Sequence, residues 1–333
     1  MIIHRCRIDT GITSSYVGTT IRDECIHARI DKISIVIPIY SEPNRDRIIN
    51  TLPDLASNNS YTINHSRKSE LYRFVLNFRV KNNPNQYIRL EYSPRRSNRG
   101  YMRLELSPQH WSAKVLSDSL KFLFSRISNT AIKWLSNSHV TRLDVALDID
   151  GHDIMKDFVI SYDKTRVGKI TNHDELLGLS LGSATSAIQC VIYEKIYYNG
   201  GTVPKSVGKG IVRVNNKHIE PFTRIEVRLR PKKVQIHPSE LYGIDNIFSS
   251  LRFYDRNKIN NDPRIPKKLK EELINKSLPE AMKEFRGASH KNRMRIKQIQ
   301  EALHDAEVEI FSKEKIWEHW PEVLKQAGIL IKR

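Results

Sequence analysis

The sequence predicts an α+β protein, with a largely antiparallel β-sheet core, packed helices and a helical C-terminal region. Several segments alternate apolar and polar side chains, the two-residue period of strands with one buried face. They are residues 71–80, 86–92, 100–106, 139–150 and 222–230. Residues 112–135 instead repeat apolar side chains every three or four positions, which is typical of a helix packed on a sheet. From residue 245 onward the pattern is helical and interrupted by prolines.

The remaining segments complete this outline. Residues 1–30 are polar and show little periodicity, so we expect an irregular arm there. The β-branched run 33–39 predicts the first strand, and residues 41–70 are expected to be mostly loop. Further strands are predicted at 165–171, 176–182 and 187–196, with a short helix near 153–162.

The segment 139–150 has the clearest alternation. Leu143, Val145 and Leu147 fall on one side of an extended chain, while Arg142, Asp144 and Asp148 fall on the other. An arginine followed two residues later by an acid recurs in other alternating runs. These triplets are Arg89-Leu90-Glu91, Arg103-Leu104-Glu105, Arg142-Leu143-Asp144 and Arg224-Ile225-Glu226.

If these strands neighbour one another in a sheet, their carboxylates can hold a hard divalent cation such as Mg²⁺ or Mn²⁺, which takes oxygen ligands. Glu105, Asp144 and Glu226 are the leading candidate ligands, followed by Asp148 and Glu91. The same pattern also fits a simpler interpretation, in which arginines and acids pair across strands on a solvated face.

The charge of the chain favours a polyanionic partner. Lys and Arg number 55 against 37 Asp and Glu, a formal net charge of +18. Nucleic acid is the first expectation. Arg95, Arg96 and Arg99 lie at the tip of a predicted hairpin, and residues 252–298 hold 14 basic and 6 acidic residues, net +8. We expect no membrane partner, because no apolar run approaches the length of a spanning helix.

The location is expected to be the cytoplasm. Three widely spread cysteines indicate a reducing compartment and no zinc site, and the N-terminus lacks the apolar core of a signal peptide.

Tyr193 is a candidate nucleophile, because it lies on a predicted strand with Lys195 on the same side. A phenol is mostly protonated at neutral pH, and nearby positive charge favours the phenolate. A tyrosine on a strand can equally serve packing alone, and Tyr197 and Tyr198 are available as well. The sequence lacks a His-x-His pair, so a paired-histidine metal motif is absent. It also lacks a phosphate-binding Gly-x-x-x-x-Gly-Lys-Ser/Thr loop, which argues against an ATP-driven motor.

Four blocks of the sequence, in this order, resemble the replication initiation factors of small rolling-circle plasmids. They are Tyr101-Met102-Arg103-Leu104-Glu105-Leu106-Ser107-Pro108, then Thr141-Arg142-Leu143-Asp144-Val145-Ala146-Leu147-Asp148, then the turn from Gly182 to Ser186 with Ile192-Tyr193-Glu194-Lys195, and Phe222-Thr223-Arg224-Ile225-Glu226-Val227-Arg228-Leu229. The second block is similar to the family's Thr-Arg-Leu-Asp signature. Filamentous-phage replication initiators share a fainter version of the pattern. Residues 1–30 and those beyond 245 show no such match.

The resemblance implies origin-specific DNA nicking and strand transfer through a 5′-phosphotyrosyl intermediate with a divalent metal. It places the nucleophile at Tyr193, with Lys195 assisting, and metal binding at Glu105, Asp144 and Glu226. Arg142 and Arg224 of the matched strands, with the arginines of the hairpin tip, are expected to contact DNA. Two departures are acidic Glu194, where the plasmid proteins have asparagine, and a longer, more basic loop at 199–220.

The implied partners are a double-stranded origin with a hairpin, the nicked single strand, a host helicase and polymerase, and a second copy of the chain in a homodimer. The chain is accordingly divided into an N-terminal arm (1–30), a catalytic nicking domain (31–244) and a basic helical DNA-binding or accessory region (245–333). Two alternatives stay open. One is a DNA-binding replication or transcription regulator without catalysis, and the other is an RNA-binding protein.

Overall fold

A computed structural model of the chain describes residues 28–66, 69–96, 99–150, 154–162, 167–172, 175–194, 196–198, 212–214, 222–232, 235–274, 276–285 and 289–331. Within these residues, ten strands form one sheet in which all neighbours are antiparallel. In spatial order they are β2 (Tyr61–Ser66), β3 (Tyr72–Val80), β4 (Asn83–Pro94), β5 (Met102–Leu106), β1 (Ala28–Ile37), β6 (His139–Asp150), β13 (Phe222–Leu229), β10 (Ile188–Glu194), β9 (Glu175–Leu181) and β8 (Val167–Asn172). The predicted α+β class with a largely antiparallel sheet is confirmed.

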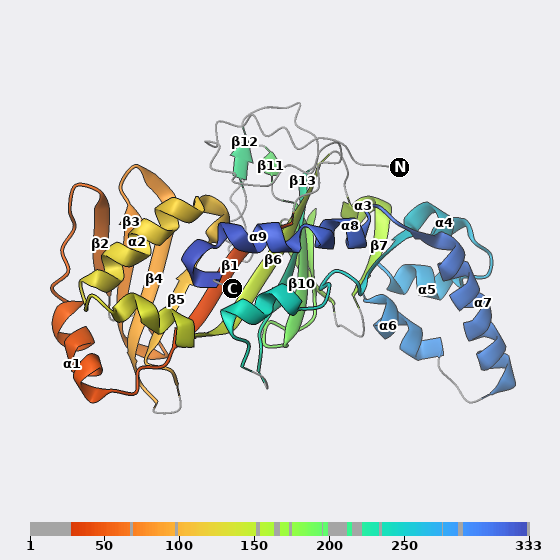
Figure 1. The fold of residues 1–333 in the computed structure, drawn as a ribbon. Helices are drawn as coiled ribbons and strands as arrows, with labels where there is room; N and C mark the ends of the chain where they lie inside the picture. The colour runs from red at the N-terminus through yellow and green to blue at the C-terminus, as the bar shows by residue number, and fades with distance from the viewer. Residues whose placement is uncertain are drawn as a thin grey trace.

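The order of the strands divides the sheet into two halves with the same topology. In the first half β1 is followed along the chain by β2, β3, β4 and β5, and β5 returns to pair with β1. In the second half β6 is followed by β8, β9, β10 and β13, and β13 returns to pair with β6. The two halves meet where β1 pairs with β6 at the centre of the sheet (Figure 1).

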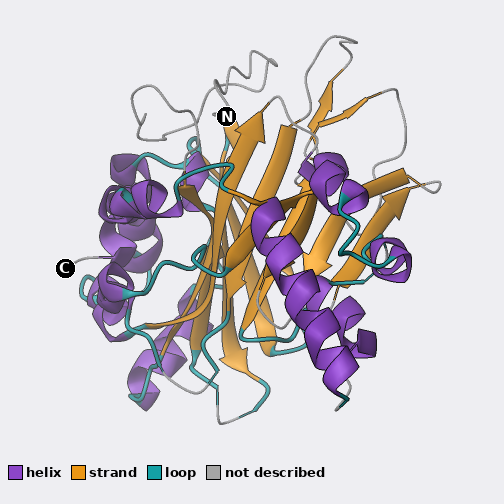
Figure 2. Ribbon diagram, turned by 90° about the vertical axis from the view of Figure 1, so that its right-hand side faces the viewer, coloured by secondary structure: helices purple, strands orange, loops and turns teal. Residues whose placement is uncertain are grey.

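Helices cover one face of the sheet and extend beyond one end of it (Figures 1 and 2). The α-helices are α1 (Glu42–Thr51), α2 (Ala113–Ser125), α3 (Ile154–Asp157), α4 (Arg256–Asn261), α5 (Lys267–Glu272), α6 (Leu278–Ala281), α7 (His290–Ala306), α8 (Lys313–Glu318) and α9 (Trp320–Gln326). The 3₁₀ helices are η1 (Pro108–His110), η2 (Ala131–Asn137), η4 (Pro238–Gly243), η5 (Met282–Phe285) and η6 (Gly328–Ile331).

Helix α2 supplies much of the main core. Leu116, Leu120 and Leu123 are spaced by four and three residues, so they share one face of the helix, and all are fully buried against the sheet. The helix begins after Ser112, whose side chain accepts a hydrogen bond from the backbone N–H of Val115 at 3.3 Å. The apolar side of the strands is thereby fixed toward the helices, and their polar side lies on the opposite face.

A second, smaller sheet joins the C-terminal region to the rest. Its order is β15 (Glu307–Val308), β14 (Leu251–Asp255) and β7 (Phe158–Tyr162). Helices α4 to α7 pack beside it around a second apolar cluster that includes Ile259, Leu269, Ile299 and Leu303. In Figure 2 this helical group lies toward the viewer. A further strand pair, β11 (Ile196–Tyr198) with β12 (Val212–Val214), is parallel.

Several sequence-based expectations need correction. The arm predicted for residues 1–30 overlaps β1, which begins at Ala28, and residues 1–27 lie outside the described residues. The loop expected at 41–70 contains α1 and β2, while the single helix expected at 112–135 is divided into α2 and η2. The C-terminal region also includes β14.

The packing does not separate cleanly at the expected boundary of 244/245. Phe248, Leu251, Trp320 and Leu324 belong to the main core together with the large sheet, whereas residues of α4 to α7 form the second cluster. The C-terminal segment therefore leaves the main core and returns to it. Among the described residues, no helix has the length and apolar character needed to cross a membrane.

Replacing Trp320 tests this return. The indole is 1% exposed, stacks on Trp317 with ring centroids 4.7 Å apart, and donates to the backbone oxygen of Leu241 at 2.7 Å. We expect Trp320→Ala to lower the free energy of unfolding by about 3–5 kcal/mol in urea denaturation. The control Ile274→Ala, at a side chain that is 60% exposed, should change it by less than about 0.5 kcal/mol. If Trp320→Ala and the wild type unfold at the same midpoint urea concentration, Trp320 does not pack in this way.

Candidate active site

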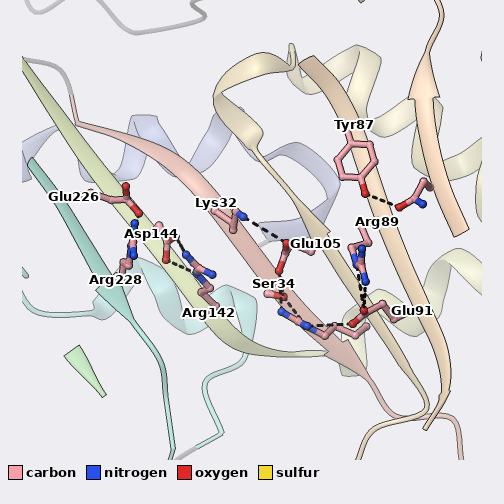
Figure 3. A network of polar contacts seen from close by, with 12 residues as sticks. Lys32, Ser34, Tyr87, Arg89, Glu91, Glu105, Arg142, Asp144, Glu226 and Arg228 are labelled. Carbon is pink, nitrogen blue, oxygen red and sulfur yellow. Dashed lines mark hydrogen bonds and ion pairs between the residues drawn. The ribbon is translucent and has the colours of Figure 1, made fainter. Parts of the chain in front are cut away.

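The polar face of the large sheet carries arginine–acid triplets on consecutive strands. The expectation that the four triplet strands lie close together in one sheet is confirmed: β4 pairs with β5, and β6 pairs with β13. Strand β1 lies between the two pairs and contributes a fifth triplet, Arg29-Ile30-Asp31. Figure 3 shows the network of polar contacts across this face.

A β-bulge places Asp31 on the polar face. Ile30 pairs with Val145 and Lys32 pairs with Asp144, so Asp31 is the extra residue of β1 at this point. The bulge shifts the alternation by one residue, because Ile30 and Ile33 are both buried in the core although three positions separate them. The side chain of Asp31 can therefore reach the acids of the neighbouring strands.

Asp31, Asp144 and Glu226 form a carboxylate cluster. One oxygen of each lies within 4.8 Å of the others. Asp144 is fully buried and Glu226 is 3% exposed, while the side chain of Asp31 keeps 20% of its surface exposed. Converging carboxylates offer only oxygen donors, which suit a hard divalent cation. The cluster can hold a metal ion, and its open side is at Asp31.

Each acid of the cluster also accepts hydrogen bonds from an arginine. Arg142 Nη2 donates to Asp144 at 2.5 Å, and Arg228 Nε donates to Glu226 at 2.6 Å. Asp31 accepts a bond from a nitrogen of Arg224 at 2.5 Å and one from the amide of Gln109. The arginines reduce the cost of burying carboxylates so close together.

The electrostatics distinguish Glu226 from the other acids. Burial and the nearby charges of Asp31 and Asp144 raise the pKa of Glu226, although Arg228 acts against them. The positive charge of Arg228 therefore does not fully offset the burial of Glu226 and its repulsion by Asp31 and Asp144. A divalent cation among the three carboxylates would remove this deficit.

Tyr193 lies at the edge of the carboxylate cluster. Its hydroxyl is 3.4 Å from Glu226 Oε2, to which it donates, and the side chain is 5% exposed. Burial raises the pKa of Tyr193, and Glu226 adds to this effect while Arg224 opposes it. The phenol is therefore held in its protonated form unless further positive charge comes close.

Glu105 and Glu91, also predicted as ligands, lie outside the cluster. Glu105 accepts from Arg103 at 2.8 Å and from Lys32 at 3.5 Å, and Glu91 accepts from Arg89 and Arg103 at 2.7 and 3.1 Å (Figure 3). Burial acts to raise the pKa of Glu105, yet Lys32, Arg103 and Arg142 together lower it. These carboxylates are satisfied by cationic side chains, so the structure groups Asp144 and Glu226 with Asp31 in place of Glu105.

Asp148 is held by two arginines. Arg224 donates to its oxygens at 2.6 and 2.8 Å, and Arg29 lies 3.2 Å away. The same Arg224 reaches Asp31, so it links Asp148 to the cluster. Arg224 is only 2% exposed, which places it within the structure of the site and not on a surface that DNA reaches directly.

The other predicted residues are placed as follows. Arg95, Arg96 and Arg99 are exposed at the β4–β5 turn, near the end of β1 opposite to Asp31. Lys195 lies outside the described residues, as do the side chains of Tyr197 and Tyr198. Asp31 was not among the predicted ligands, although its triplet repeats the arginine–acid spacing of the others.

Gly178 is a further residue of the site and was not predicted. It lies on β9 directly beside Tyr193 of β10. A Cβ atom at this position would lie 2.5 Å from the oxygen of Ile192 and 2.8 Å from Cβ of Tyr193. Glycine therefore permits the close approach of β9 that supports the backbone of the candidate nucleophile.

Compared with known proteins, the chain matches no protein-family model and no curated sequence. The likeness to plasmid replication initiators therefore rests on the four sequence blocks. The convergence of Tyr193 with carboxylates is an independent observation of geometry.

Gly178→Ala should strain β9 against β10. We expect a loss of about 1–3 kcal/mol in the free energy of unfolding, since both neighbouring atoms are close to backbone and cannot rotate away. Gly243→Ala is the matched control, because its Cβ would meet nothing within 4 Å. Urea denaturation of the two variants measures the difference. Equal stability would show that β9 is not tightly packed on Tyr193.

Asp31→Asn should weaken Mn²⁺ binding by at least about tenfold in calorimetric titration, because it removes a carboxylate from the cluster. Glu105→Gln, at an acid satisfied by Lys32 and Arg103, is the control and should leave the affinity unchanged. If Glu105→Gln removes binding while Asp31→Asn does not, the ligand set is that of the sequence-based prediction.

The same titration should depend on pH. Because the pKa of Glu226 is raised, the metal-free protein keeps a proton there to higher pH than a free glutamate does. Mn²⁺ must displace this proton, so its affinity should rise as pH increases through the raised pKa and then level off. Without metal, the stabilising contribution of protonated Glu226 is lost over the same range, so the stabilisation by Mn²⁺ should grow there. An affinity independent of pH would argue against Glu226 as a ligand.

Proposed function

We propose that the chain is a rolling-circle replication initiator that nicks origin DNA and transfers the cut strand through Tyr193. The observation that carries the proposal is the position of the Tyr193 hydroxyl, 3.4 Å from Glu226 within a cluster of three carboxylates. The four sequence blocks that resemble plasmid initiators support it, because they include both Tyr193 and two acids of the cluster.

In the proposed reaction the oxygen of Tyr193 attacks the scissile phosphorus. The bond from phosphorus to the 3′ oxygen breaks, which leaves a 5′-phosphotyrosyl link and a 3′-hydroxyl that takes its proton from water. Glu226 is positioned to accept the proton of the phenol. A bound Mg²⁺ or Mn²⁺ would supply stabilisation of charge on the phosphate oxygens.

The phosphotyrosyl link is itself a phosphodiester. Attack by a later 3′-hydroxyl therefore reseals the strand and releases Tyr193 without nucleotide hydrolysis. This agrees with the lack of a phosphate-binding loop in the sequence. The proposal includes host polymerase and helicase as partners, because the free 3′-hydroxyl must be extended and the duplex unwound. The proposal also includes a homodimer as the working form of the chain and the host cytoplasm as its location.

Recognition of the duplex origin is assigned to α7. Its first half exposes Lys291, Arg293, Arg295 and Lys297 and contains no acid. Cations near a helix N-terminus are opposed by the helix dipole, and like charges four residues apart repel. The arrangement is unfavourable for the isolated helix and becomes favourable beside a polyanion, which supports contact with DNA phosphates.

A specific observation favours a second candidate, a DNA-binding regulator without catalysis. Asp144 and Glu226 are each already bonded to an arginine, and burial keeps the phenol of Tyr193 protonated. Cross-strand ion pairs alone would explain this geometry. Salt-sensitive DNA binding without metal-dependent cleavage would select this candidate.

Tyr193→Phe should abolish nicking of a supercoiled plasmid that carries the cognate origin, in Mg²⁺ or Mn²⁺, and should abolish the covalent protein–DNA adduct. The change removes only the hydroxyl that faces Glu226. Tyr87→Phe is the matched control, because Tyr87 lies on the same polar face but donates to Asn77. Gel electrophoresis separates nicked from supercoiled DNA, and denaturing gels detect the adduct.

Asp144→Asn should lose cleavage and retain origin binding. Nicking by Tyr193→Phe at the wild-type rate would overturn the assignment of the nucleophile, and Tyr197→Phe and Tyr198→Phe would then be the next variants to assay. Loss of folding in Asp144→Asn would instead favour a structural role for the ion pairs.

A further inference from the structure

Beyond Glu226, Arg228 of β13 and Arg230, which directly follows that strand, continue the alternation toward the polar face. Arg228 pairs with Asp144 and Leu229 pairs with Leu143 in the antiparallel register with β6. Arg230 directly follows this paired stretch and Arg142 directly precedes Leu143, and the two arginines are close enough to repel each other. Figure 3 shows Arg228 and Arg142 on either side of Asp144, next to Glu226.

Arg230 is incompletely bonded. Within the described residues its buried Nη1 has no hydrogen-bond partner. Its Nη2 reaches Gln189 Oε1 at 3.4 Å, a long contact. Gln189 is itself 4% exposed, and its amide nitrogen donates to Ser180 at 2.8 Å, which fixes its oxygen toward Arg230. The guanidinium is thus held in place with part of its donor capacity unused.

Two arginines lie close to Arg230. Burial lowers the pKa of Arg230, and repulsion from Arg142 and Arg228 lowers it further, while Asp144 and Glu226 act against this. Like charges opposite each other on neighbouring strands destabilise a sheet. Arg142 and Arg228 are also needed by Asp144 and Glu226, whereas Arg230 forms no ion pair with an acid among the described residues.

We infer that Arg142, Arg228 and Arg230 form a phosphate subsite beside the carboxylate cluster, where Arg230 binds a backbone phosphate of single-stranded DNA. The planar guanidinium provides paired donors that match phosphate oxygens. Arg230 is partly exposed, and the side chains of Arg142 and Arg228 beside it are 25% and 26% exposed, so the subsite is reachable from solvent. The inference rests on the proposed function in one respect, since the strand bound here would be the one presented to Tyr193.

A phosphate subsite also explains why Arg230 lies close to two other arginines. A phosphate bound beside Arg230 would offset the repulsion among the three arginines. In such an arrangement Arg230 does not react. It holds the strand in register with the hydroxyl of Tyr193.

Arg230→Gln tests the inference through binding, in the Tyr193→Phe background and in EDTA so that no cleavage occurs. A fluorescent oligothymidylate serves as the probe in anisotropy titrations at several salt concentrations. We expect the affinity to fall at least about tenfold. The slope of log affinity against log salt should become shallower by about 0.7, the value for one phosphate contact to a single strand.

Arg126→Gln is the charge-matched control, because Arg126 follows α2 and stacks over the ring of Phe122. It should leave affinity and slope close to those of the parent. A second readout separates binding from structure: Arg230→Gln should raise the thermal midpoint, since it relieves the repulsion from Arg142. A structural arginine would lower the midpoint when replaced.

Parent-like affinity and slope in Arg230→Gln would overturn the inference, and so would a lowered midpoint with unchanged affinity. Failure of the proposed function is detected separately, because a chain that never nicks DNA can still lose affinity when Arg230 is replaced. Conversely, nicking through Tyr193 with parent-like binding by Arg230→Gln would reject the subsite alone.

Discussion

The compensation of buried negative charge governs the polar face of this sheet. Ionised carboxylates are costly to remove from water unless cations approach them. At Asp148, Glu91 and Glu105 arginine and lysine side chains supply that compensation. At Glu226 they do not suffice, and its pKa is raised. The difference sets Glu226 apart from the acids whose charge arginine and lysine side chains already balance.

Both halves of the sheet carry arginine-x-acid triplets, but the acids of these triplets have different surroundings in the two halves. In the first half, β4 and β5 place arginines and glutamates in mutual ion pairs that satisfy both partners. In the second half, β13 and β6 hold Glu226 and Asp144 close to Asp31. Asp31 lies on β1, the strand of the first half that pairs with β6. The candidate site therefore depends on the central β1–β6 pairing, where a bulge turns Asp31 toward its neighbours.

Much of this arrangement could be predicted from sequence, because strand alternation is a local property. The strands that carry Glu105, Asp144 and Glu226 were predicted, and so was their proximity in one sheet. Asp31 escaped prediction because the bulge interrupts the period of two, so it fell between the predicted arm (1–30) and the predicted first strand (33–39). The exclusion of Glu105 depends on Lys32 and Arg103 reaching it from other strands, and spacing along one strand does not reveal this. Gly178 depends equally on strand pairing, since its neighbour Tyr193 lies on another strand.

The most direct test of this account is a crystal structure of the chain soaked in Mn²⁺, with anomalous diffraction to locate the metal. The account predicts a peak among Asp31, Asp144 and Glu226, at about 2.1–2.2 Å from their oxygens, with the hydroxyl of Tyr193 adjacent. A fully occupied peak elsewhere, or no peak while Arg142 and Arg228 stay bonded to Asp144 and Glu226, would contradict it. The face would then be a set of ion pairs on a basic protein.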